Sequence, residues 1–227
     1  MNTETAGLLL ALLPFIIGSA VVPVQIIMFI LLLKSPEQGT IKATLFVAGM
    51  TLVRLAQGFL FGFVLTGGDS SVERTGVIKY TLLLVIAVLL LITAYKKWRH
   101  DEDPDAPPPK WLTMFDSVSP GKAFGFGALF PLISPKLWVF ALSALAVIYE
   151  TQLGQPNSTI MYVLFILLAQ LILLLLLLIR ILLPKQASSL LDSLSEWLNR
   201  NNRVIVIVVA LVFGLLFLYQ GITGLLA

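Results

Sequence analysis

The fold of this chain is decided by the segment ALLPFI at residues 11–16, which recurs in altered form as ALFPLI at residues 128–133. Each copy is soon followed by a second proline, Pro23 or Pro135, and then by a long apolar run. Proline inside a helix removes a backbone hydrogen bond and clashes with the preceding turn. In a membrane, such a break survives only where it is buried in protein or lines a cavity. The paired segments therefore predict two broken membrane-spanning helices, a pattern that marks the binding sites of many transporters.

The composition predicts a helical integral membrane protein. Hydrophobic residues make up 58% of the chain and charged residues 12%, with a mean hydropathy of +0.97, whereas soluble domains carry about 25% charged residues. Continuous apolar runs indicate helices, because membrane strands alternate over about ten residues. The chain has no cysteine, and its single histidine, His100, lies in a charged segment. We therefore expect no disulfide, no metal site and no cofactor.

The apolar runs predict six membrane spans, each near or above the ~20 residues needed to cross a bilayer. Because three is an odd number, two halves of three spans each must insert with opposite orientation. The predicted fold is an all-α membrane protein with two inverted three-helix repeats, in which helices one and four are broken at prolines. The predicted spans cover residues 6–33, 43–65, 77–95, 123–149, 159–183 and 204–225.

The predicted repeats cover residues 1–98 and 121–227, and a cytoplasmic linker at residues 99–120 joins them. Residues 101–109 read DEDPDAPPP, an acidic and proline-rich composition that is typical of a solvated connector. In the second repeat, apolar side chains recur at helical spacing between residues 186 and 202 and predict a short interfacial amphipathic helix. A simple surface connector is the alternative for that segment.

Basic residues are distributed unequally between the two sides of the predicted bundle. Only Arg74 and Lys79 fall on one side. The positive-inside rule places the more basic side in the cytoplasm, so both termini are predicted to lie on the non-cytoplasmic face of a multi-pass plasma (inner) membrane. The basic side holds Lys34, Lys42, Lys96, Lys97, Arg99, Lys110, Lys122, Arg180, Lys185, Arg200 and Arg203.

Motifs for nucleotide-driven transport and for hydrolysis are absent from the sequence. It contains no G-x-x-x-x-G-K-[ST] phosphate loop, no G-x-S-x-G elbow and no H-E-x-x-H zinc motif. We therefore expect a protein that is not an enzyme.

Two cations inside the predicted spans are the strongest candidates for a binding site. Arg54 lies near the middle of the second span, and Lys136 lies in the fourth, directly after Pro135. Intramembrane charges are rare, costly and normally functional, and no Asp or Glu inside the spans can pair with them. We predict that both cations face one cavity and attract an anionic group such as a carboxylate, phosphate or sulfate. The alternative is that they bind carbonyl groups freed by the proline breaks.

The other predicted site residues surround the two breaks, where unwound backbone and polar side chains meet at one depth of the membrane. The full predicted substrate site comprises Lys136, Arg54, Pro135, Ser134, Pro131, Pro14, Pro23 and Gln25. For Gln57, Ser143 and Gln170, two interpretations stay open, a polar path or hydrogen bonds between helices.

Local spacing predicts helix packing and helix starts. Gly58 and Gly62 share a helix face with Arg54 and predict the close approach of another span. Two Ser-Pro pairs, beginning at Ser35 and Ser119, each place an N-cap residue before a proline and predict the start of a helix.

The fourth span and the segment before it resemble a known family. Residues 110–127 read KWLTMFDSVSPGKAFGFG and are followed by SPK at residues 134–136, which is similar to the signature of the GAP family. These are glycolipid- and peptidoglycolipid-addressing membrane proteins of the lysine-exporter superfamily. Lys136 matches the lysine of the family motif, whereas Ser134 stands where the family usually has asparagine. The resemblance implies secondary export of small polar metabolites or movement of envelope glycolipids.

The leading functional prediction is a secondary transporter that exports a small polar metabolite or a (glyco)lipid with an anionic group by alternating access. The alternative is a non-transporting accessory subunit of a lipid or envelope export system. A membrane enzyme acting on lipids ranks third, because no nucleophile and base set is visible. Expected partners are membrane lipids and a small-molecule or lipid substrate, with no nucleic acid, and a homo-oligomer is compatible with the sequence.

Overall fold

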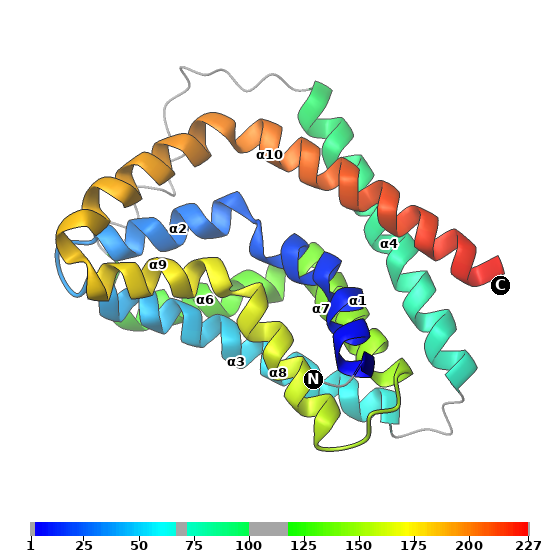
Figure 1. Ribbon diagram of the computed structural model, residues 1–227. Coiled ribbons are helices and arrows are strands. Elements are labelled where there is room, and N and C mark those ends of the chain that lie inside the picture. Colours follow the sequence, from blue (N-terminus) through cyan, green and yellow to red (C-terminus); the bar gives the residue numbers. More distant parts are fainter. Residues whose placement is uncertain (1–2, 67–71, 100–117, 227) are drawn as a thin grey trace.

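The computed structural model describes residues 3–66, 72–99 and 118–226, and within them every regular element is a helix, so the all-α prediction is confirmed (Figure 1). Most of the predicted linker at residues 99–120, and residues 110–117 of the family signature, lie outside the described residues. The helices are α1 (Thr3–Ala20), α2 (Pro23–Lys34), α3 (Gly39–Thr66), α4 (Val72–Arg99), α6 (Pro120–Ile133), α7 (Pro135–Glu150), α8 (Asn157–Ala169), α9 (Leu171–Leu182) and α10 (Pro184–Leu226).

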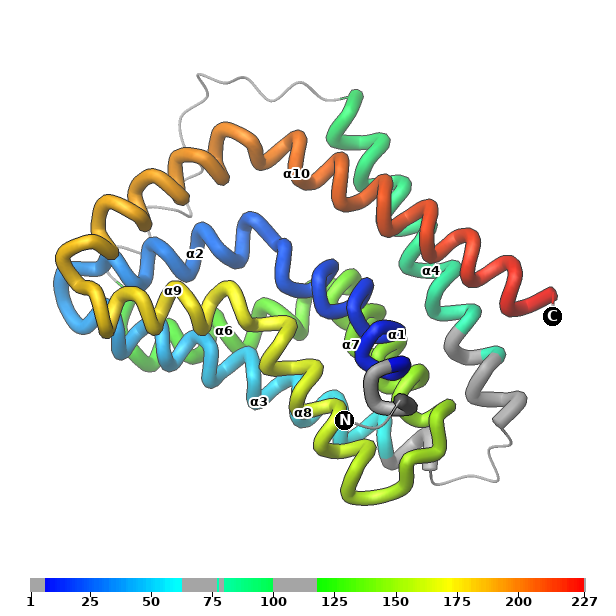
Figure 2. Tube along the Cα trace, viewed as in Figure 1, coloured from blue at the N-terminus to red at the C-terminus, as the bar shows by residue number. Residues whose placement is uncertain are grey.

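The helices are compatible with a multi-pass membrane protein. Among the described residues, α3, α4 and α10 are each long and apolar enough to cross a membrane, and three bent helix pairs bring the number of candidate spans to as many as six. The pairs α1–α2, α6–α7 and α8–α9 bend by 59°, 73° and 61°. Figure 2 follows the Cα path through the bends after α1 and α8. The predicted breaks in the first and fourth spans are therefore confirmed.

The breaks lie at the second proline of each repeated segment. Pro23 and Pro135 are the first residues of α2 and α7, and the residues before them, Val22 (φ −119°, ψ 98°) and Ser134 (φ −92°, ψ 102°), are extended. A proline clashes with a helical residue before it and pushes that residue into the β region, and it starts a new helix without losing a hydrogen bond.

Three local predictions were wrong. Pro14 and Pro131 do not break a helix, because they lie inside α1 and α6. Ser35 is the C-cap of α2, and α3 begins only at Gly39, whereas Ser119 does cap α6 by accepting a hydrogen bond from the Lys122 backbone N–H at 3.4 Å.

The predicted amphipathic helix at residues 186–202 is not a separate element. It forms the first part of α10, a continuous helix of 43 residues, which is about 65 Å long at 1.5 Å per residue. No glycine or proline occurs between Lys185 and Phe213, so nothing in the backbone ends the helix before the last span begins. This helix is far longer than the ~30 Å hydrocarbon core, and its amphipathic part must extend beyond one bilayer crossing.

The buried apolar side chains form two clusters that divide the bundle. The α1–α7 cluster contains residues of α1, α4, α7, α8 and the C-terminal part of α10. The α2–α9 cluster contains residues of α2, the start of α3, α6, α9 and the N-terminal part of α10. In Figure 1, α2, α6 and α9 lie together on one side, and α1, α7 and α8 lie on the other. The helix breaks fall between these two groups.

Candidate functional site

Polar residues occupy the points where the chain passes from one apolar cluster to the other. In the first span, the α1–α7 cluster ends at Val22 and the α2–α9 cluster begins at Ile26. Gln25 lies between them and is fully buried. In the fifth span, the corresponding passage runs from Ala169 to Leu173 and contains Gln170.

The second and fourth spans follow the same rule. In α3, the buried apolar residues of the α2–α9 cluster end at Met50, and Phe61 packs against the other cluster. Arg54 and Gln57 lie between these points, and each is 3% exposed. Lys136 occupies the passage from α6 to α7. We call Gln25, Thr51, Arg54, Gln57, Lys136 and Gln170 the polar layer.

Several buried atoms in and beside the polar layer have no hydrogen-bond partner among the described residues. They are Nη2 of Arg54, both amide atoms of Gln25, Nε2 of Gln57 and, two turns into α7 from Lys136, Oγ of Ser143. Buried polar atoms are almost always paired, and an uncompensated buried charge is costly. Gln57 lies about one turn from Arg54 on α3, so unpaired N–H donors of both side chains accompany the buried charge. An anionic group would satisfy such donors.

Contacts with the fifth span hold the Arg54 segment in place. The Tyr162 hydroxyl donates to the Arg54 carbonyl oxygen at 2.9 Å, and the Arg54 and Tyr162 side chains lie within electrostatic range of each other. One turn earlier in α3, the Gln170 amide donates to the Thr51 hydroxyl at 3.1 Å. These bonds hold this segment of α3 against the fifth span and do not involve the Arg54 guanidinium.

The break at Gln170 was not predicted, because no proline marks it. Its backbone is non-helical (φ −106°, ψ 7°), and its side-chain amide reaches both the Ile166 carbonyl at 3.4 Å and the Thr51 hydroxyl. A polar side chain that bonds to nearby backbone carbonyls competes with regular helix geometry. The sequence signal was a lone glutamine within an otherwise apolar run.

The proline break in the fourth span is also compensated by a side chain. The Trp138 indole N–H donates to the Leu132 carbonyl at 2.8 Å, and its ring packs edge-on against Phe61 at 5.7 Å between centroids. The indole therefore satisfies a carbonyl at the end of α6 that has no partner within the helix.

The structure places the predicted site residues in different environments. Gln25 and Arg54 are buried in the polar layer, and Pro131 is buried near the end of α6. Lys136 and Ser134 are half-buried and Pro135 is exposed, and Lys136 makes no hydrogen bond or ion pair with any other described residue. That Arg54 and Lys136 face one cavity stays a prediction. Pro14 lies more than a full turn before the first break.

A cleft of about 470 Å³ lies beside the polar layer and is lined by none of the predicted site residues. One face of α3 from Leu55 to Gly62 forms one wall, and Tyr149 of α7 and the start of α8 as far as Val163 form the rest. A smaller apolar cleft of about 190 Å³ includes Pro23 and lies under Trp197 of α10. The sequence did contain a signal for the larger cleft, the glycine pair of α3.

Those glycines do allow the close approach of other helices, as predicted. A Cβ atom at Gly58 would overlap the Tyr162 ring, and one at Gly62 would lie 2.6 Å from the Tyr149 hydroxyl. A second close contact joins α3 and α6, where a Cβ at Gly49 or Gly127 would meet the backbone of the other helix. Small residues let membrane helices approach in this way.

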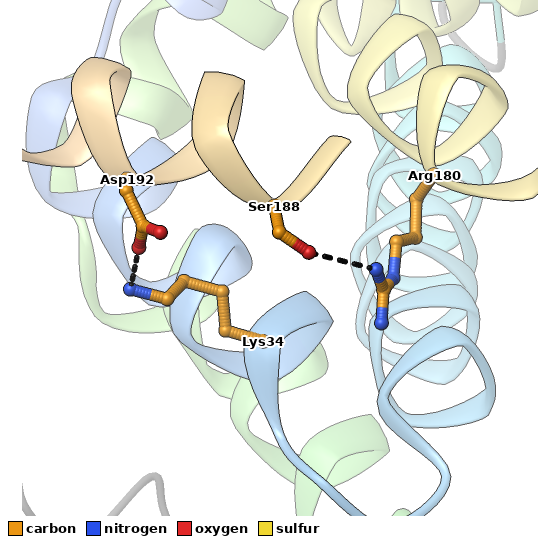
Figure 3. Close-up of polar contacts among 4 residues, drawn as sticks. All are labelled: Lys34, Arg180, Ser188 and Asp192. Atoms are coloured by element: carbon orange, nitrogen blue, oxygen red, sulfur yellow. Dashed lines mark hydrogen bonds and ion pairs between the residues drawn. The ribbon is translucent and has the colours of Figure 1, made fainter. Parts of the chain in front are cut away.

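Polar contacts attach the start of α10 to the bundle (Figure 3). Lys34 at the end of α2 forms an ion pair with Asp192, and the Arg180 guanidinium of α9 donates to the Ser188 hydroxyl at 3.5 Å. Because both attachments are solvent-exposed, each contributes little to stability. They fix the position of the amphipathic segment over α2 and α9.

A comparison with family models places the chain among known proteins. The model described as "Sap, sulfolipid-1-addressing protein" matches residues 12–223, which is consistent with the glycolipid-addressing resemblance seen in the sequence. No curated protein and no solved structure matches the chain.

Proposed function

We propose, from the premise that this chain belongs to the Sap, sulfolipid-1-addressing protein family, that it exports an anionic lipid across its membrane by alternating access. Family membership indicates a lipid-related role at a membrane. A sulfolipid carries a negatively charged sulfur group, which is the kind of charge that a buried guanidinium binds. Of the two substrate classes considered from the sequence, the lipid is therefore the one that we propose.

The observation that carries this proposal is the environment of Arg54. Its side chain is buried between two apolar clusters, it has an unpartnered guanidinium nitrogen, and Gln25 and Gln57 beside the helix breaks also have unpartnered atoms. An intramembrane charge is a functional-site hypothesis by default. We propose that Arg54 binds the anionic head group, with Lys136 as a second cation at the start of α7.

The helix contacts support an inverted-repeat mechanism. In an inverted repeat, α1 would correspond to α6, α2 to α7, α3 to α8–α9, and α4 to α10. Each contact between two helices should then be matched by a contact between their counterparts. The contact of α4 with α7 is matched by that of α10 with α2, and the contact of α3 with α6 by that of α8 with α1. In the two apolar clusters, α1 and α7 contribute to the α1–α7 cluster, and their counterparts α6 and α2 contribute to the α2–α9 cluster. We infer that opening alternates between them around the polar layer.

We further propose that the basic side of the bundle faces the cytoplasm. The ends of α2 and α9 and the starts of α3, α6 and α10 then lie at the inner surface, with the α2–α9 cluster in the inner half of the membrane. The amphipathic part of α10 would lie at that surface, where its basic residues meet anionic lipid head groups.

Lipid movement in reconstituted vesicles tests the proposal. Purified protein is placed in liposomes that contain fluorescent phosphatidylglycerol, and dithionite reports the probe that reaches the outer leaflet, with and without a pH gradient. We expect transfer by the protein alone. Arg54→Gln should slow transfer about tenfold or more, since hydrogen bonds to charged groups contribute about 1.5–3 kcal/mol.

The matched control is Arg99→Gln, which removes the same charge at an exposed position at the end of α4. It should leave transfer unchanged. Arg54→Gln should also fold as well as the parent chain or better, because it removes a buried charge without a partner. Protein that moves no lipid in any condition would favour the accessory-subunit alternative, and an Arg54 variant with parental transfer would remove Arg54 from the mechanism.

A further inference from the structure

The cleft of α3, α7 and α8 has a lining that the head-group site does not explain. Its volume of about 470 Å³ is within the range of small-molecule sites. Apolar side chains supply most of its walls, and Phe59 and Val163 at its mouth are 78% and 37% exposed. Because these two lining side chains are exposed, the cleft is accessible from the outside of the bundle, on a face that would meet membrane hydrocarbon.

Two glycines of α3 shape one wall of the cleft. At Gly58 and Gly62, any larger residue would collide with Tyr162 or with the Tyr149 hydroxyl. The two glycines allow both aromatic rings to lie against α3, where they form the floor of the cleft. Phe59, in contrast, points away from the core and borders the opening.

Tyr162 connects the cleft to the polar layer. One side of its ring lines the cleft, and its hydroxyl donates to the Arg54 carbonyl oxygen. The Arg54 charge lies within electrostatic range of the same side chain. The cleft thus lies next to the backbone of a buried cationic residue whose Nη2 has no hydrogen-bond partner among the described residues.

We infer that this cleft binds the acyl chain of the anionic lipid whose head group lies at Arg54. The inference rests on the proposed function and adds a second part to its site. A hydrophilic metabolite would fill the polar layer alone, whereas an amphiphile needs an apolar exit for its chain. In hydrocarbon the chain gains only packing contacts by entering the cleft, so selectivity must come from the charge.

The test compares two lipid probes with the same photoactivatable acyl chain, one with the anionic phosphatidylglycerol head group and one with the zwitterionic phosphatidylcholine head group. The full chain is reconstituted with each probe, irradiated, and its adducts are mapped by mass spectrometry. Labelling of residues 55–62 and 157–163 is compared with that of the exposed α10 face at residues 204–215. We expect the anionic probe to favour the cleft about tenfold, or about 1.4 kcal/mol, and the zwitterionic probe to show no preference.

One variant that fills the cleft and one control variant test whether the lipid probe labels residues inside the cleft. Val163→Trp places a large side chain in the cleft and should reduce cleft labelling about tenfold. Val212→Trp makes the same change at an exposed valine of α10 and should leave cleft labelling unchanged. Equal cleft labelling by both probes, or full labelling of Val163→Trp, would overturn the inference. If the cleft carries no adducts and Val163→Trp dissociates a dimer of the protein, this face binds a second copy of the chain. That result would also overturn the inference.

The outcome is separable from that of the proposed function. Arg54-dependent lipid transfer without selective cleft labelling would refute only the chain-binding cleft. Charge-selective cleft labelling without any transfer would support a lipid-binding protein and refute export.

Discussion

The contact between α3 and α6 yields a prediction in which two neighbouring glycines of one helix respond in opposite directions. Gly127 faces α3 so closely that a Cβ atom would overlap the Phe46 carbonyl, whereas a Cβ at Gly125 would meet nothing within 4 Å. The atoms in the way at Gly127 belong to backbone, which cannot rotate aside as a side chain can.

The magnitudes follow from two opposing effects. Replacing a helical glycine by alanine gains about 0.5–1 kcal/mol, because glycine loses more conformational entropy on folding. Forcing one additional methyl group into a filled contact costs about 1–3 kcal/mol. Gly125→Ala should therefore raise stability by about 0.5–1 kcal/mol, and Gly127→Ala should lower it by about 1–2 kcal/mol.

Thermal unfolding of the purified variants in one detergent measures both values, with the parent chain as reference. Gly49→Ala introduces its methyl group into the same contact from the α3 side, where the nearest atoms are backbone of Phe124 and Ala128. The double variant with Gly49→Ala and Gly127→Ala should lose less stability than the sum of the two single losses. Once the first methyl group has separated the helices, the second causes less overlap. If Gly127→Ala is as stable as Gly125→Ala, the helices are not in backbone contact and the reasoning is refuted.

Three further predictions concern polar contacts between helices. Replacing Thr51 by valine and Gln170 by leucine should each cost about 0.5–1.5 kcal/mol, and a double-mutant cycle of unfolding energies should give a coupling of about 0.6 kcal/mol, as is typical inside membranes. Charge reversal at Lys34 or Asp192 alone should cost less than about 1 kcal/mol, and reversal of both should restore stability. Replacing Arg203 by methionine should cost about 1–2 kcal/mol, because its guanidinium donates two hydrogen bonds, of 3.0 and 2.8 Å, to carbonyls at the end of α4.

Most of the fold could be predicted from sequence, since its determinants act locally. Long apolar runs specify membrane helices whatever they contact, and a proline restricts the residue before it wherever the chain goes. The breaks at Val22 and Ser134 follow from that rule. The prediction failed where the sequence signal was weak, as at Gln170, and where it placed a helix boundary without a residue that ends helices, as near Arg203 within α10.

The candidate site could be predicted only in part. Arg54 was identified because charge is costly at its depth in the membrane. The partners of its segment were not, because Tyr162 lies 108 residues further along the chain and Gln170 lies 119 residues from Thr51. No pattern within one span reports which face of a distant span will meet it.

The amino-acid sequence by itself determined that this chain forms membrane helices, where proline interrupts two of them, and that two cations lie within spans that contain no carboxylate. Only the tertiary structure decided that polar residues of four spans lie between two apolar clusters and that Arg54 has a nitrogen without a partner among the described residues. It also decided that two glycines let tyrosine rings pack against α3 beside a cleft. The physical reason is that backbone geometry and the free energy of moving a side chain into hydrocarbon depend on each residue and its sequence neighbours. The hydrogen-bond partners and packing of a side chain depend on which helix faces meet.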